Sequence, residues 1–129
     1  MSGCFSVKPV YFEDDKRIAQ KQIEKFHALF NEKRYEEMYE LFTSNKQREI
    51  SKEQFVSHLK DLYSQAGPVE NSKLIKIEVR VEASIRLVHM FYETRFEGGK
   101  RFEEFDCLTD GEKASIDFYG QPGNIPGVP

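Results

Sequence analysis

Residues 75–82 have the sequence Ile-Lys-Ile-Glu-Val-Arg-Val-Glu, in which each apolar residue is followed by a charged one. A repeat of two residues is typical of a β-strand that buries one face and exposes the other. Turn-forming pairs follow at Ala83-Ser84, Gly98-Gly99 and Asp110-Gly111, and the last two are strong hairpin signals. We therefore predict one antiparallel sheet over residues 73–119, whose strands are separated by these three turns.

Each turn also fixes which residues face each other across neighbouring strands. The predicted pairs are Tyr92–Phe105, Met90–Cys107, Phe105–Ile116, Glu103–Phe118, Ile75–Tyr92 and Ile77–Met90. These pairs assemble one mainly apolar face, while charged residues gather on the other face. Because three separate turns agree, we predict a four-stranded antiparallel meander with one face covered by helices.

Helical periodicity precedes the strands. Apolar residues recur at helical spacing in three stretches, which predict helices over residues 13–30, 35–42 and 51–65. Glu13-Asp14-Asp15 supply negative charge that favours the start of a helix. Thr43-Ser44-Asn45 end the second helix, because these side chains compete for backbone hydrogen bonds. Ser51 and Gln54 have the spacing of a capping box, and Gly67-Pro68 ends the third helix.

Three helices followed by a curved meander resemble the nuclear transport factor 2-like (cystatin-like) superfamily. The resemblance is carried by the segments Phe91–Lys100, Leu108–Gly111 and Phe118–Gly120, which are similar to the last three strands of small bacterial envelope domains of unknown function. Those domains usually carry a Trp where this chain has Lys113. The resemblance implies an α+β domain over residues 13–120, preceded by a flexible tether (residues 1–12) and followed by a loose tail (residues 121–129).

Composition excludes several classes of protein. The 129 residues include 19 basic and 22 acidic side chains, for a net charge of −3. No basic stripe is present, so we do not expect nucleic-acid binding. Apolar runs do not exceed three residues, which is far too short for a transmembrane helix. The chain also lacks phosphate-binding, zinc-protease, nucleophile-elbow and paired-cysteine motifs, and we expect neither a cofactor nor a metal site.

The resemblance further implies a conical pocket between the helices and the sheet. In some members of the superfamily a buried carboxylate or a His–Asp pair catalyses a reaction in this pocket, and other members only bind ligands or partners. The side chains of this chain that could reach such a pocket are Tyr39, His58, Tyr63, Tyr92, Thr94 and Glu103.

Glu103 is the one acidic residue on the predicted apolar face. A carboxyl group there could have a raised pKa and act as a base. The interpretation that we favour is that Glu103 lies near the edge of the sheet and pairs there with Arg101. His27 and His58 are expected to be boundary residues of helices.

Glu93, Glu104 and Asp117 are predicted to lie side by side on the polar face of the sheet. Such a row of like charges needs compensation. Either Arg95 and solvent provide it, which we favour, or a bound cation does.

We therefore expect a non-catalytic bacterial envelope module, a monomer or homodimer that binds a protein partner or a small apolar ligand. The alternative is a small pocket enzyme of the isomerase or dehydratase type that uses Glu103 as its base. Ser2-Gly3-Cys4 resembles the end of a bacterial lipoprotein signal, which makes Cys4 a candidate lipidation site. A periplasmic protein, anchored in the outer membrane, is then expected, and an ordinary cytoplasmic start is the alternative.

Overall fold

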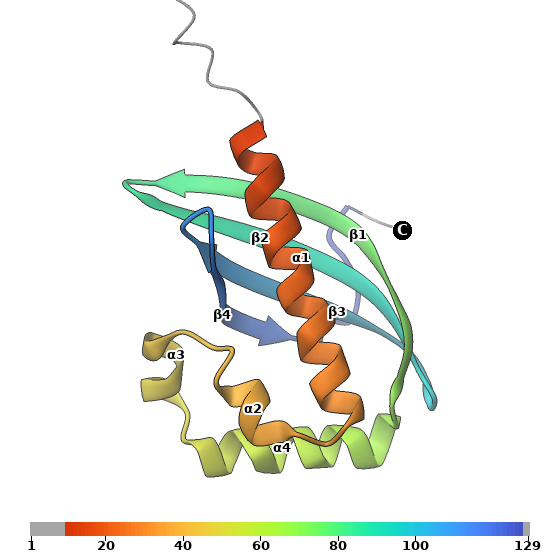
Figure 1. Ribbon diagram of the computed structural model, residues 1–129. Helices are drawn as coiled ribbons and strands as arrows, with labels where there is room; N and C mark the ends of the chain where they lie inside the picture. Colours follow the sequence, from red (N-terminus) through yellow and green to blue (C-terminus); the bar gives the residue numbers. More distant parts are fainter. Residues whose placement is uncertain (1–9, 128–129) are drawn as a thin grey trace, which may run out of the picture.

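The computed structural model describes residues 10–127, and within them the chain forms four helices and four strands. The helices are α1 (Val10–Asn31), α2 (Tyr35–Tyr39), α3 (Ser44–Glu49) and α4 (Lys52–Ala66). The strands are β1 (Val69–Glu82), β2 (Ile85–Phe96), β3 (Gly99–Thr109) and β4 (Ala114–Gly120). They form one antiparallel sheet in the order β1-β2-β3-β4, and the helices lie on one of its faces (Figure 1). The predicted α+β fold is confirmed.

The helical region differs from the prediction at two places. α1 begins at Val10, inside the stretch expected to be a tether, whereas residues 1–9 lie outside the described residues. Thr43 does not simply end a helix. Its side-chain oxygen accepts a hydrogen bond from the Lys46 amide at 3.1 Å and caps the additional helix α3. A hydroxyl that competes with one helix can satisfy the first turn of the next. The capping box of Ser51 and Gln54 is confirmed at the start of α4.

The turn between β2 and β3 lies one residue earlier than predicted. It consists of Glu97 and Gly98, whose amides donate to the carbonyl oxygens of Pro68 and Ala66 at 2.9 and 2.8 Å. These hydrogen bonds join the turn to the chain that leaves α4. Gly99 follows with φ 139°, a conformation that glycine adopts more readily than other residues. The position of the turn is therefore set by contacts with a helix that is distant in the sequence.

Because the turn is displaced, Tyr92 pairs with Glu103, two residues away from the predicted partner. A shift of two residues leaves each side chain on its predicted face, since the side-chain period of a strand is two. In β1, Ile77 pairs with Met90 as predicted. A register irregularity then brings Leu74, and not the residue after it, opposite Tyr92. The predicted faces are thus more accurate than the predicted pairs.

The last strand departs further from the prediction. Beyond Ile116, β4 has one residue more than β3 requires, so that Asp106 pairs with Phe118. An extra residue of this kind reverses which side chains point to the core. Phe118 is 39% exposed, and Tyr119 packs against the core in its place. The prediction that Phe118 faces Glu103 is therefore wrong.

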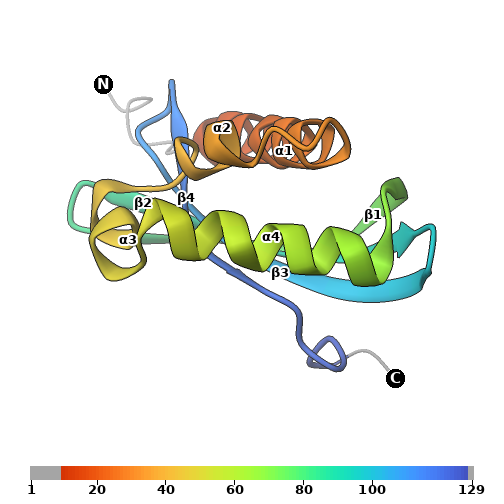
Figure 2. The ribbon, with the colours of Figure 1, turned by 90° about the horizontal axis from the view of Figure 1, so that it is seen from below.

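Residues after β4 lie on the face of the sheet opposite to α1 (Figures 1 and 2). Gln121 accepts a hydrogen bond from the Arg101 guanidinium at 3.0 Å. Ile125 is only 1% exposed, so the prediction of a loose tail is wrong at this residue. A single apolar side chain is enough to hold a short segment against a sheet that offers it a covered site.

The N-terminal half of α1 is joined to the sheet through Asp15, which is fully buried. Its carboxylate accepts a hydrogen bond from the Thr109 hydroxyl at 3.0 Å and contacts the Arg86 guanidinium at 2.6 Å. Thr109 ends β3, and Arg86 belongs to the start of β2. Asp15 thus connects one helix with two strands.

We expect Asp15→Asn to lower the free energy of unfolding by about 3 kcal/mol, because it leaves the Arg86 guanidinium without its counter-charge. Asp14→Asn is the matched control, since that carboxylate is 59% exposed and pairs with Arg17. Its expected cost is below about 0.5 kcal/mol. Urea unfolding followed by circular dichroism measures both values, and equal losses would contradict the anchoring role of Asp15.

Candidate functional site

A cluster of four polar side chains lies within the apolar core. Its centre is the carboxylate of Glu103, which is 1% exposed. The Oε1 atom lies 2.7 Å from His27 Nε2 and accepts a hydrogen bond from Thr94 Oγ1 at 2.6 Å. The Oε2 atom accepts a hydrogen bond from the Tyr119 hydroxyl at 2.5 Å. We call Glu103, His27, Thr94 and Tyr119 the Glu103 cluster.

Four different elements supply the Glu103 cluster. His27 belongs to the apolar stripe of α1, Thr94 to β2, Glu103 to β3 and Tyr119 to β4. The extra residue in β4 is what turns Tyr119 inward. Without it, the phenol ring would lie on the opposite face of the sheet.

The interpretation that Glu103 pairs with Arg101 at the edge of the sheet is wrong. The Arg101 guanidinium bonds to Gln121 instead, and Glu103 points into the core. His27 and Tyr119 were absent from the predicted site. The helical periodicity of α1 placed His27 near the core, but nothing in the local sequence indicated that Tyr119 would replace its neighbour there.

The contacts of Glu103 decide its protonation. Burial alone raises the pKa of Glu103, but the hydrogen bond and charge of His27, together with hydrogen bonds from Thr94 and Tyr119, outweigh burial and lower it. The pKa of Tyr119 lies well above its usual value, because the ring is buried and the negative charge of Glu103 is adjacent. Glu103 is thus a carboxylate whose two oxygens are both occupied, and Tyr119 stays a hydrogen-bond donor.

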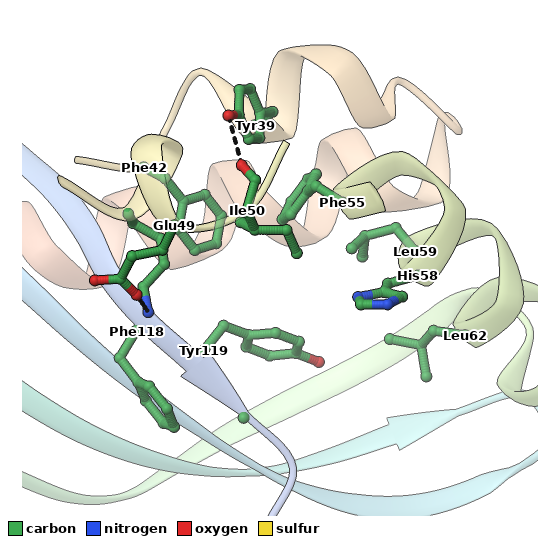
Figure 3. A pocket seen from close by; sticks show the side chains of 12 residues that line it. Tyr39, Phe42, Glu49, Ile50, Phe55, His58, Leu59, Leu62, Phe118 and Tyr119 are labelled. Carbon is green, nitrogen blue, oxygen red and sulfur yellow. Dashed lines mark hydrogen bonds and ion pairs between the residues drawn. The ribbon is translucent and has the colours of Figure 1, made fainter. Parts of the chain in front are cut away.

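A pocket of about 390 Å³ lies beside the Glu103 cluster, between the helices α2, α3 and α4 and the strand β4 (Figure 3). Its lining is mainly apolar and aromatic, and consists of Tyr39, Phe42, Lys46, Glu49, Ile50, Phe55, His58, Leu59, Leu62, Phe118, Tyr119 and Gly120. Tyr119 is the one residue that belongs to both the pocket and the Glu103 cluster. Its ring forms part of the pocket wall, and its hydroxyl is bonded to Glu103.

Two of the six predicted pocket residues, Tyr39 and His58, line this pocket. The hydroxyl of Tyr39 lies 2.8 Å from the carbonyl oxygens of both Gln47 and Ile50, so it is occupied by the backbone. His58 extends from α4 into the space above Tyr119 (Figure 3). It is the titratable ring nearest to the pocket's open side, and it is exposed.

The other predicted residues lie elsewhere. Thr94 and Glu103 are sealed in the core. Tyr92 lines a separate cleft of about 160 Å³ beside His27, and burial raises the pKa of its hydroxyl well above the usual value. Tyr63 packs against Phe30, with ring centroids 5.2 Å apart. The predicted set is therefore divided among a pocket, a small cleft and the core.

The predicted row of acidic residues on the outer face does not form. Glu93 pairs with Phe102 instead of Glu104, and Asp117 accepts a hydrogen bond from the Thr43 hydroxyl at 2.7 Å. Within residues 10–127, no three His, Cys, Asp or Glu side chains are placed to hold a metal ion. None of the helices described is long and apolar enough to span a bilayer.

The lowered pKa of Glu103 predicts how its contribution to stability depends on pH. A carboxyl with a lower pKa in the folded chain than its unfolded value of about 4.3 stabilises the fold above that value. The contribution is lost as pH falls through the folded-state pKa. We therefore expect Glu103→Gln to cost about 3 kcal/mol at neutral pH, and clearly less near pH 3 (roughly one unit below the unfolded pKa).

Unfolding by urea at both pH values measures this difference, with Glu112→Gln as the control at an exposed carboxylate. A cost of Glu103→Gln that is the same at both pH values would show that the charge of Glu103 is not what stabilises the fold.

Comparison with known proteins agrees with this fold. Residues 18–94, more than half of the chain, match the family described as "NTF2-like N-terminal transpeptidase domain". A solved structure of Bd1075 from Bdellovibrio bacteriovorus is similar, with a TM-score of 0.55 and 12% sequence identity. The similarity covers 84% of this chain and 40% of that chain, so this chain spans less than half of Bd1075. No curated protein matches the chain. The resemblance to the NTF2-like superfamily is confirmed, and the chain belongs to the family of NTF2-like N-terminal transpeptidase domains.

Proposed function

We propose that this chain is a non-catalytic module of the bacterial cell envelope that binds a small apolar ligand in the pocket between α2, α3, α4 and β4. The observation that carries the proposal is the pocket itself, which is open to solvent on one side and walled mainly by Phe, Leu and Ile side chains. Its volume of about 390 Å³ falls in the range of small-molecule sites in proteins.

The polar groups around the pocket favour an apolar ligand over a polar one. The hydroxyls of Tyr39 and Tyr119 are engaged with the backbone and with Glu103. Lys46 and Glu49 form an ion pair of 3.0 Å with each other. What remains for a ligand is apolar surface, whose burial contributes about 25 cal/mol per Å².

The Glu103 cluster supports a non-catalytic role. A general base needs a free lone pair within reach of the substrate proton. Both Glu103 oxygens accept hydrogen bonds, and the carboxylate lies behind the ring of Tyr119 rather than in the pocket. The lowered pKa of Glu103 also makes it a weaker base than an ordinary carboxylate. These observations favour a structural role for Glu103 over the isomerase-like alternative.

The envelope location is supported by the family, whose description names transpeptidases, and by the sequence Ser2-Gly3-Cys4. Cys4 lies outside the described residues. A lipid on this residue would hold the module at a membrane surface, near other envelope proteins.

Ligand binding is tested with the fluorescent apolar probe 1-N-phenylnaphthylamine. We expect the chain to bind it, and His58→Trp to weaken binding at least about tenfold, because the larger ring fills the open side of the pocket (tenfold corresponds to about 1.4 kcal/mol). Ser64→Trp, on the same helix but outside the pocket, is the matched control and is expected to leave the affinity unchanged. Equal affinities for the two variants, or no binding by the unaltered chain, would contradict the proposed ligand and favour a protein partner.

Lipidation is tested by labelling cells that express the complete gene with radioactive palmitate. We expect the protein to be labelled and the Cys4→Ser variant to be unlabelled, because the thiol of Cys4 is the proposed attachment point. Label that persists in Cys4→Ser would refute lipidation at this residue.

A further inference from the structure

The two edges of the sheet are treated differently. The outer edge of β4 is covered, because Thr43 donates to the carbonyl of Ile116 and Ile116 donates to the carbonyl of Leu41, both at 2.8 Å. At the outer edge of β1, the Asn31 side chain bonds to the amide and carbonyl of Val69 at 2.7 and 2.9 Å. Within residues 10–127, no backbone hydrogen bond reaches the rest of this edge. An open edge of this length is a ready template for another strand.

The open part of β1 carries an alternating charge pattern. From Lys76 to Glu82, β1 pairs with β2 without any irregularity. The side chains on the outer face of this segment alternate in sign: Lys76, Glu78, Arg80 and Glu82. The face toward the helices carries Ile77, Val79 and Val81. Val81 is 53% exposed, which is unusual for a large apolar side chain in this fold.

We propose that two copies of this chain associate through their β1 strands, antiparallel and with Val79 of one copy opposite Val79 of the other. In this register Lys76 lies opposite Glu82 of the second copy, and Glu78 lies opposite Arg80. Two-fold symmetry repeats both pairs, so all four charges of each strand face opposite charges. On the other face, Ile77 lies opposite Val81 of the second copy and covers its exposed surface.

The charge pattern selects this register over its neighbours. With the two-fold axis at Glu78, Lys76 would face Arg80, and with the axis at Arg80, Glu78 would face Glu82. Both arrangements place like charges directly opposite each other, which destabilises a strand pair. Charges that only protect an edge from pairing need no such complementarity. The pairing joins two sheets edge to edge, and because few residues take part, the association is weak and depends on concentration.

Charge exchange across the pair tests the proposal. Sedimentation equilibrium of the full chain, at concentrations up to about 1 mM, measures the dissociation constant. Lys76→Glu and Glu82→Lys each place like charges opposite one another twice per dimer. We expect each single variant to dissociate at least about tenfold more readily. The double variant Lys76→Glu/Glu82→Lys restores opposite charges and is expected to associate like the unaltered chain.

A second arm uses the single variants together. Mixed in equal amounts, Lys76→Glu and Glu82→Lys present four complementary charges to each other, so we expect them to associate although neither does so alone. Lys60→Glu, on the exposed surface of α4, is the control for net charge, and thermal melting checks that each variant is folded. A chain that stays monomeric up to about 1 mM, single variants that associate normally, or a double variant or mixture that does not associate would each overturn the proposal.

Discussion

A charged carboxylate can remain inside an apolar core only where hydrogen-bond donors surround it. Glu103 is in this position, and its donors come from three elements that are far apart in the sequence: His27 in α1, Thr94 in β2 and Tyr119 in β4. All three must be in place at the same time, since a missing donor would leave a buried charge unsatisfied. The rotation of α1 about its axis and the register of three strands are therefore linked through one side chain.

The pocket depends on the same constraint. Tyr119 is held by Glu103 on one side and faces the pocket on the other. The orientation of its ring is thus fixed from behind, by a group that no ligand touches. A wall fixed in this way loses little conformational entropy when a ligand binds, and recognition is then a matter of shape rather than of hydrogen bonding.

The alternation of Ile77, Val79 and Val81 with charged residues made the sheet and its faces predictable, because a period of two survives any register shift of two residues. The displaced turn at Glu97 was not predictable from its own sequence, since the carbonyls of Pro68 and Ala66 set its position. The site was harder to predict than the fold. His27 could be placed near the core from the pattern of α1, but the inward position of Tyr119 depends on one extra residue in β4 that leaves no local signal. Asp15 was predicted only as a charge at a helix start, and its burial follows from tertiary contacts with Arg86 and Thr109.

The extra residue in β4 also limits how the gene can change in length. A deletion of one codon near Asp117 would give β4 the length that its register with β3 requires. Phe118 would then enter the core and Tyr119 would leave it, so a single deletion would exchange two aromatic side chains and remove a donor from Glu103. A compensating insertion would have to lie within the same few codons to reverse the exchange. Point substitutions in β4 can accumulate one at a time, whereas changes of length in this strand can be inherited only in pairs.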